Sequence, residues 1–216
     1  MRALVFHGPG DVRLEGVPRP EPGPGDVLVQ VELALTDGTD LKAFRRGHPV
    51  LLGEPPSPFG HEFCGFDVAT GRRVAGANSA PCGSCAACGR GQETLCESLL
   101  PLLNGAYAEY LLVPERIARR NLLPVPHGLA SEVAALEPGG TLLVFADAGA
   151  IPAAPLYRRE LTVVGSRSAT PAHMREAVRL LPGLDLPAPT VLPLDRFAEG
   201  LELQRTRDAA KVVFVP

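Results

Sequence analysis

Residues 27–40 read Val-Leu-Val-Gln-Val-Glu-Leu-Ala-Leu-Thr-Asp-Gly-Thr-Asp, and the apolar run at 27–35 is the longest candidate strand of the chain. Asp37 lies just beyond its end. On either side, shorter runs of strand-forming residues follow one another, separated by turns that draw on the 23 glycines and 23 prolines. Many short strands joined by such turns are typical of a barrel or a sandwich. The sequence therefore predicts one of these folds through about residue 125.

The alternation of apolar and polar residues sets the expected elements of this first part. A short helix is expected at 41–47, because Asp40 is a residue type that caps helix N-termini. Ile117 is expected to continue the strand pattern. We expect strands at 2–6, 12–17, 27–35, 61–66, 72–77 and 105–113.

The pattern changes after about residue 126, where apolar runs without alternation appear, as in buried parallel sheets. Two such runs lie at 141–146 and 161–166. Residues 172–181 have apolar side chains at helical spacing after Pro171, which suits the first position of a helix. A second helix is expected at 194–203 and a closing strand at 211–215. The fold class is therefore mainly β with an α/β part.

Length, charge and hydropathy exclude several classes of protein. The 216 residues suffice for one large domain or two small ones. A net charge of -3 argues against a nucleic-acid surface. No stretch approaches the ~20 apolar residues of a membrane span, and the apolar start of the chain is too short for a signal peptide. We expect a cytoplasmic protein that binds neither nucleic acid nor membrane.

Four of the five cysteines are crowded into the pattern Cys82-x-x-Cys85-x-x-Cys88-x7-Cys96. Four thiolates at this spacing can surround one tetrahedral zinc with no open position, which is typical of a structural site. The alternatives are four unligated thiols and an iron-sulfur cluster. The fifth cysteine, Cys64, falls inside an apolar run and is expected to be a buried small hydrophobic residue.

A second set of possible ligands lies at the ends of expected strands. Gly60-His61-Glu62 supplies an imidazole and a carboxylate, and Asp37 and Glu137 supply further carboxylates. Catalytic zinc sites draw on nitrogen and oxygen donors of this kind and leave one position open for water or substrate.

Other motifs follow in order along the whole chain. They are Met1-Arg2-Ala3, Pro24-Gly25-Asp26-Val27-Leu28-Val29, Gly38-Thr39-Asp40, Gly105-Ala106-Tyr107-Ala108-Glu109-Tyr110, Gly139-Gly140-Thr141-Leu142, Leu161-Thr162-Val163-Val164-Gly165-Ser166 and Lys211-Val212-Val213. With the two ligand clusters, they resemble the zinc-containing medium-chain dehydrogenases, a family that includes alcohol, sorbitol, threonine and glucose dehydrogenases. The resemblance implies a GroES-like barrel at 1–126 with a zinc lobe at 82–96, a truncated Rossmann-like remnant at 127–170, and a segment at 171–216 that returns to the catalytic domain.

The chain departs from most of this family at Asp37, where a cysteine is usual. Aspartate there resembles some glucose dehydrogenases, and by that resemblance zinc would bind Asp37 and His61, with Glu62 and Glu137 as direct or water-mediated ligands. The alternative for Asp37 is a solvated loop residue. Thr39 stands where the family has a hydroxyl that relays the substrate proton, with Lys42 as a weaker candidate for its outer end. The alternative for Thr39 is a turn hydroxyl bonded to its own backbone.

The second departure concerns the nucleotide-binding domain. Its Gly-x-Gly-x-x-Gly turn after a strand, with an acidic residue about 20 residues later, does not occur in this sequence. The first half of that domain therefore looks deleted between Pro138 and Gly139. Such a deletion would leave the strands at 141–146 and 161–166 with open edges, which favour pairing with another chain. We expect a homo-oligomer through these strands.

Three functions remain open from the sequence. By family, the chain would be a zinc-dependent alcohol or polyol dehydrogenase that transfers hydride from a zinc-bound alcohol to NAD(P). The missing fingerprint favours instead an inactive zinc-binding pseudoenzyme or an oligomeric binding protein. A third possibility is cofactor-free zinc chemistry with Glu62 as the base.

Overall fold

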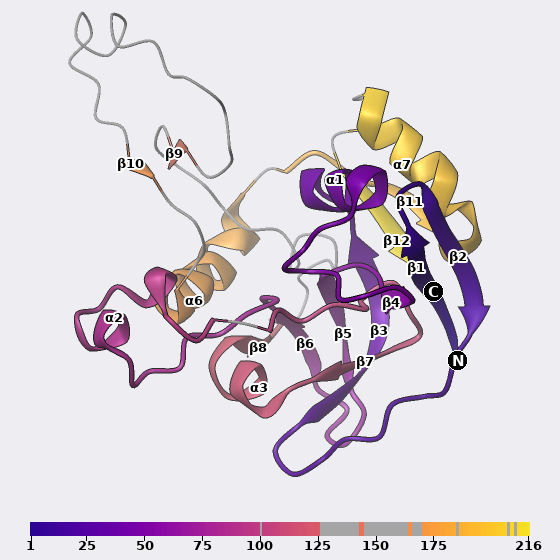
Figure 1. Cartoon of the computed structure of the whole chain (residues 1–216). Coiled ribbons are helices and arrows are strands. Elements are labelled where there is room, and N and C mark those ends of the chain that lie inside the picture. The colour runs from indigo at the N-terminus through magenta and orange to yellow at the C-terminus, as the bar shows by residue number, and fades with distance from the viewer. Residues whose placement is uncertain are drawn as a thin grey trace, which may run out of the picture.

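The computed structural model describes residues 1–99, 101–125, 143–144, 164–165, 170–184, 186–206, 208–209 and 211–216 (Figure 1). Its strands are β1 (Arg2–Gly8), β2 (Asp11–Gly16), β3 (Val27–Leu35), β4 (Ser57–Pro58), β5 (Glu62–Asp67), β6 (Arg73–Gly76), β7 (Tyr110–Val113), β8 (Leu122–Pro124), β9 (Leu143–Val144), β10 (Val164–Gly165), β11 (Thr190–Pro193) and β12 (Val212–Val215). Its helices are α1 (Gly38–Arg46), α2 (Ala86–Gly89), α3 (Glu115–Asn121), α6 (Pro171–Leu180), α7 (Phe197–Thr206) and the 3-10 turns η1 (Glu93–Leu95), η2 (Leu181–Gly183) and η3 (Leu194–Arg196).

Strand β3 is the centre of the larger sheet. It pairs antiparallel with β5 along most of its length, with β7 at its first residues and with β12 at its last. The sheet runs in the order β11-β12-β3-β5-β6-β8, so the C-terminal strands lie beside the N-terminal ones. A second sheet, β2-β1-β4, joins it through a bridge between Ala3 and Ala108. The strand predicted at 27–35 is thus confirmed and is the element around which the others pair.

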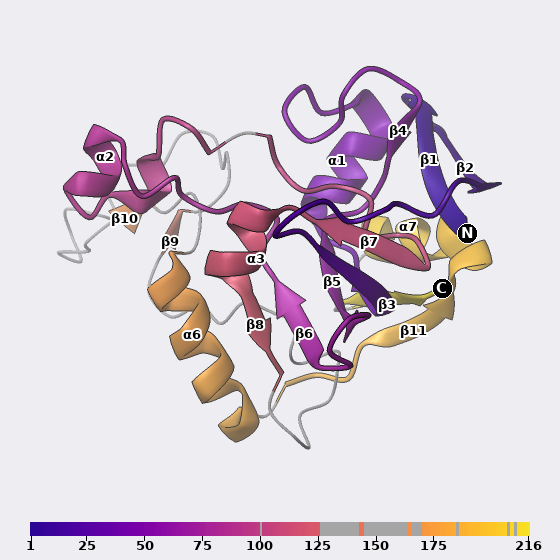
Figure 2. The ribbon, with the colours of Figure 1, turned by 90° about the horizontal axis from the view of Figure 1, so that it is seen from below.

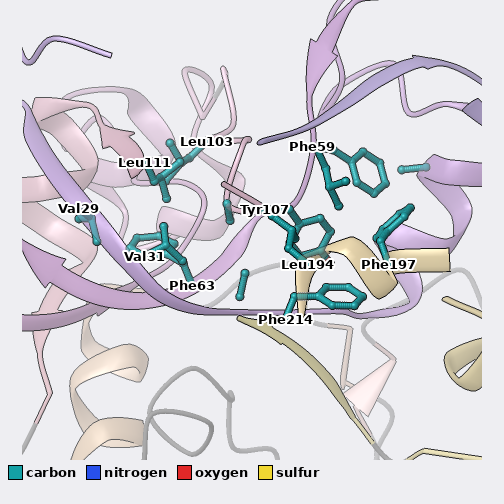
Figure 3. Close-up of a cluster of buried hydrophobic side chains, with 14 of the residues drawn as sticks. Val29, Val31, Phe59, Phe63, Leu103, Tyr107, Leu111, Leu194, Phe197 and Phe214 are labelled. Carbon is teal, nitrogen blue, oxygen red and sulfur yellow. The ribbon is translucent and has the colours of Figure 1, made fainter. Parts of the chain in front are cut away.

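An aromatic cluster fills the space between the sheet and helix α7, as Figure 3 shows. The ring of Tyr107 lies 5.4 Å from that of Phe214 and 5.7 Å from that of Phe59. Phe197, at the start of α7, lies 5.7 Å from Phe214. All four side chains are buried. Residues nearly the whole length of the chain apart therefore share one core.

The cysteine lobe, which contains α2 and η1, extends from the barrel on the side opposite the β1–β2 hairpin in both Figure 1 and Figure 2. Helix α3 lies between this lobe and strands β6 and β8 (Figure 2). The parallel pairing expected for the two later apolar runs is confirmed where the structure describes them, in β9 and β10. Among the described residues, no helix is long and apolar enough to cross a membrane.

Three expectations are wrong. The strand expected at 105–113 begins only at Tyr110, because the backbone N–H groups of Gly105 and Ala106 both donate to the Gly60 carbonyl oxygen instead of joining a strand ladder.

The helix after β3 begins at Gly38, not at 41, because Asp37 rather than Asp40 is its cap. Ile117 lies in helix α3, not in a strand, because Pro114 ends β7 and turns the chain so that the residue is buried from a helix. Strands β4, β8 and β11 were not expected; each has only two to four residues, too few to show a period.

Replacing Phe214 by alanine should test how far the C-terminal strand supports the barrel. Its side chain is fully buried between Tyr107 and Phe197. We expect Phe214→Ala to lower the free energy of unfolding by about 3–5 kcal/mol in urea denaturation. Val215→Ala, at a neighbouring residue that is 42% exposed, is the matched control. Equal losses in the two variants would contradict this packing.

Candidate metal centres

Asp37 follows β3 and caps helix α1. Its Oδ1 accepts hydrogen bonds from the backbone N–H groups of Thr39 at 2.7 Å and Asp40 at 3.0 Å. Asp40 returns the contact, accepting from the Asp37 backbone N–H at 3.0 Å, which completes a capping box. The cap uses Oδ1, so Oδ2 remains directed at His61, 3.8 Å from its Nε2. The cap fixes the carboxylate in this orientation.

His61 contacts the buried carboxylate of Asp40 through the ring nitrogen that faces away from Asp37. Its Nδ1 lies 3.1 Å from Asp40 Oδ1, and Asp40 has no exposed surface. The Tyr107 hydroxyl lies 2.8 Å from Asp40 Oδ2 and 3.0 Å from the Leu35 carbonyl oxygen. A carboxylate on one imidazole nitrogen orients the other nitrogen toward a metal, as in many metal sites. Asp40 is thus placed to orient His61, with Nε2 left on the side of Asp37.

Glu62 is paired with a lysine from the other end of the chain. Its Oε2 accepts from Lys211 Nζ at 2.7 Å, and both side chains are half-buried. Lys211 arrives there because β12 pairs antiparallel with the end of β3, which brings the residue before β12 opposite the residues that follow β3. Because this contact depends on strand pairing across the sequence, no local pattern around Lys211 could have indicated it.

The charges of this cluster shift one another's pKa values. Burial would lower the pKa of His61, but the carboxylates of Asp40, Asp37 and Glu62 raise it to about 9. Burial would raise the pKa of Asp37, yet His61, the capping N–H groups and Lys211 hold it below its usual value. Burial raises the pKa of Glu62, with Lys211 opposing the shift. The cluster is therefore a balance of carboxylates against two basic side chains.

One ligand atom from each of Asp37, His61 and Glu62 lies within 4.8 Å of the others. The set offers one nitrogen and two oxygens and leaves a coordination position without a protein ligand, which is the composition of a catalytic zinc site. The buried carboxylate behind His61 is the second feature expected of such a site. These residues therefore fit a zinc ion.

Thr39 and Lys42, two further predicted site residues, do not belong to this group of three ligands. Thr39 is half-buried in the first turn of α1, and within the described part of the chain its hydroxyl makes no hydrogen bond. Its proposed turn contact with the backbone is therefore not formed there. Lys42, one turn further, is exposed. Glu137 lies outside the described residues.

The four cysteines of the lobe also converge. The ligand atoms of Cys82, Cys85, Cys88 and Cys96 lie within 4.8 Å of one another. Backbone N–H groups of Ser84 and Cys85 point at Cys82 Sγ at 3.4 and 3.3 Å. Such donors stabilise thiolates, and they lower the pKa of Cys82 to about 5. Four thiolate donors at this separation fit a tetrahedral zinc.

Cys64 lies apart from both clusters. Its side chain is fully buried in β5, and burial raises the pKa of its thiol to about 12. This agrees with the expectation of a small hydrophobic residue.

Replacing Asp40 by asparagine should weaken zinc binding at Asp37, His61 and Glu62. The amide keeps the size of the side chain but removes the charge behind Nδ1 of His61. We expect the affinity to fall by ~10–100-fold, measured by chelator competition with the cysteine site saturated. Asp11→Asn, which changes an exposed carboxylate paired with Arg13, is the control. An unchanged affinity in a folded Asp40→Asn protein would show that Asp40 does not orient the ligand.

Comparison with known proteins identifies relatives of this arrangement. Residues 23–127 match the model of the alcohol dehydrogenase GroES-like domain. The L-threonine 3-dehydrogenase of Rhizobium rhizogenes is 34% identical over 151 residues, 63% of this chain and 42% of that protein. That of Stenotrophomonas maltophilia is 36% identical over 155 residues, 62% of this chain and 43% of that protein. The chain thus spans less than half the length of these curated relatives.

Solved structures agree on the fold. A thermostable alcohol dehydrogenase from Pyrobaculum aerophilum aligns with a TM-score of 0.79 at 19% identity, over 100% of this chain and 99% of that chain. An alcohol dehydrogenase from Thermus sp. ATN1 aligns with a TM-score of 0.74 at 23% identity, with the same coverage. The expected fold class, mainly β with an α/β part, is confirmed by these likenesses and by the sheets described above. Residues 23–127 therefore carry the alcohol dehydrogenase GroES-like domain, and the chain is similar in fold to alcohol dehydrogenases and, over part of its length, in sequence to L-threonine 3-dehydrogenases.

Proposed function

We propose that the chain is a zinc-dependent oxidoreductase that oxidises the hydroxyl-bearing carbon of a small alcohol, with NAD(P) as the hydride acceptor. The observation that carries this proposal is the convergence of Asp37, His61 and Glu62, with Asp40 buried behind the imidazole. Metal sites that serve only a structural role are usually closed by four protein ligands, whereas this one offers three. The half-buried hydroxyl of Thr39, in the first turn of α1, further supports the proposal, because the reaction needs a group that takes the substrate proton.

Each protein group has a defined task in this reaction. Zinc bound at Asp37, His61 and Glu62 would supply Lewis acidity toward the substrate oxygen. Asp40 holds His61 in one orientation, and the capping bonds hold Asp37, so the three ligand atoms need little rearrangement. Thr39 Oγ1 accepts the hydroxyl proton of the substrate while its own hydroxyl proton passes to solvent, on the side of α1 where Lys42 is exposed. A nicotinamide bound beside this site would supply the acceptor for the hydride of the substrate carbon.

The substrate class follows from relatives and from ligand chemistry. The curated relatives are named L-threonine 3-dehydrogenase, which supports a hydroxyl beside a polar group. Asp37 in place of the family's cysteine resembles glucose dehydrogenases, which supports a polyol or sugar. Both are small hydroxylated molecules. A panel of L-threonine, polyols and sugars therefore covers the proposed range.

Zinc as the metal is supported by the donor sets and by a cobalt- and zinc-bound structure of the Pyrobaculum aerophilum enzyme, which aligns with a TM-score of 0.79. We propose a structural zinc at the four cysteines and a catalytic zinc at Asp37, His61 and Glu62. The soft thiolate ligands of the cysteine site select zinc more strongly than the carboxylate ligands of the catalytic site do. The catalytic site is therefore expected to exchange its metal more readily.

A second candidate function is a zinc-binding pseudoenzyme. Two observations favour it: the sequence lacks the dinucleotide fingerprint, and Glu62 is engaged by Lys211 at 2.7 Å. Glu62 is thus paired with the Lys211 ammonium group, whereas the oxidoreductase would need Glu62 to bind zinc. The two functions differ in whether the protein binds a nicotinamide.

Titrating NADH and NADPH into the zinc-loaded protein should separate these functions. For an oxidoreductase, we expect a saturable change in cofactor fluorescence and zinc-dependent reduction of NAD(P)⁺ with at least one alcohol of the panel. In a His61→Ala protein that circular dichroism shows to be folded, turnover should be abolished because a metal ligand is lost, while the saturable change in cofactor fluorescence should remain as in the unmodified protein. No saturable change at millimolar cofactor, with zinc confirmed by elemental analysis, would leave the pseudoenzyme or cofactor-free zinc chemistry.

Assembly and location complete the proposal. The runs at 141–146 and 161–166 are proposed to pair with a second copy of the chain; their described residues form the two-stranded parallel sheet of β9 and β10. We expect gel filtration to give a dimer or larger species, and a monomer at all concentrations would contradict this. We also propose domain boundaries after residues 126 and 170. A cytoplasmic location is proposed as well, because it would keep the four cysteines of the lobe reduced.

A further inference from the structure

Helix α3 contacts the cysteine lobe at successive points along its length. Arg116 Nη1 donates to the Ser98 carbonyl oxygen at 2.7 Å, beyond the last cysteine of the lobe. Asn121, which is buried, donates through Nδ2 to the Ser79 carbonyl oxygen at 2.6 Å, before the first cysteine. The same helix packs on β6 and β8. It therefore holds both ends of the lobe against the barrel.

Arg120 contacts the lobe between these two ends. Its Nη2 lies 3.5 Å from the Cys82 carbonyl oxygen, and its Nη1 lies 3.7 Å from a carboxylate oxygen of Glu93. Cys82 is the first cysteine of the lobe, and Glu93 lies in η1, between the third cysteine and the fourth. A single guanidinium thus spans the two segments that supply the metal ligands.

The packing around this guanidinium is close. Gly83 has a φ of +77°, and a Cβ built there would overlap the Arg120 guanidinium. The backbone conformation therefore favours glycine at 83, and the Arg120 guanidinium occupies the space into which a side chain there would project. One small cavity of about 180 Å³ is also lined by Cys82, Glu115, Arg116, Arg119 and Arg120. Three guanidiniums and one carboxylate thus lie beside the Cys82 corner of the lobe.

The negative charge of a metal–thiolate centre gives a nearby arginine a role. Four thiolates around one Zn²⁺ carry a formal charge of about −2, which must be offset by N–H donors or cations nearby. Backbone N–H groups supply part of this at Cys82, as described above. Of the guanidiniums of α3, that of Arg120 reaches the Cys82 segment, whereas that of Arg119 is paired with Glu115.

We propose that Arg120 is a positioning residue for the cysteine site: it joins the Cys82 segment to the Glu93 segment and offsets the charge of the metal–thiolate centre. Its role is to slow the loss of metal from the lobe. The inference concerns the cysteine site alone and holds whether or not the chain oxidises an alcohol.

The test uses cobalt in place of zinc, because sulfur-to-cobalt charge-transfer absorption reports only the site that contains thiolates. The full-length protein is loaded with Co²⁺ and mixed with excess EDTA, and the decay of that absorption gives the release rate. We expect Arg120→Ala to release the metal ~10-fold faster than the unmodified protein, the size of effect seen when a supporting contact of a metal ligand is lost.

Arg119→Ala is the matched control. Arg119 lies on the same helix and lines the same cavity, but its side chain is 76% exposed and contacts Glu115, not the lobe. It should release cobalt at the unmodified rate. Equal rates for Arg119→Ala and Arg120→Ala would overturn the proposal.

Arg120→Lys keeps the test valid if the alanine variant does not fold. Lysine retains the charge but lacks the planar fork that reaches two acceptors at once. We expect a release rate between those of the unmodified protein and the alanine variant. Release of cobalt from Arg120→Lys at the unmodified rate would overturn the bridging role.

Discussion

The hydrogen bond between Asp40 and His61 is the constraint on which the candidate catalytic site depends. Asp40 is wholly buried, and a buried carboxylate is stable only when its oxygens are satisfied. Here the donors are the Asp37 backbone N–H, the His61 imidazole and the Tyr107 hydroxyl. They come from the start of a helix, the start of β5 and the aromatic core. One side chain therefore sets the relative positions of three parts of the barrel.

This arrangement also ties the site to the stability of the core. Burial and the neighbouring Asp40 carboxylate raise the pKa of Tyr107 well above its usual value, so its phenol remains a neutral donor. The ring of the same residue packs against Phe59, Phe197 and Phe214. Loosening that packing would move the donor that satisfies Asp40. Core packing and ligand orientation are therefore not independent here.

Much of this could be predicted from the sequence, since it depends on local patterns. The strand at 27–35, the helix after Pro171 and the cysteine spacing are each encoded within a few neighbouring residues. The helix cap at Asp37 was misplaced because Asp37 and Asp40 are both good capping residues, and only the reciprocal bonds distinguish them. The contact of Lys211 with Glu62 could not be predicted, because it depends on the pairing of strands 176 residues apart in sequence, as the Thr36–Val212 bond shows.

The placement of β12 next to β3 has a consequence for how the protein is made. Residues 212–215 emerge from the ribosome long after β3, so Ala34 and Leu35, at the end of β3, lack this partner during most of the intervening synthesis. Contacts between such distant segments also form slowly, because a long loop must close first. The nascent barrel would therefore expose the apolar end of β3 until residues 212–215 have emerged, a period in which chaperones that bind extended apolar segments have a clear target.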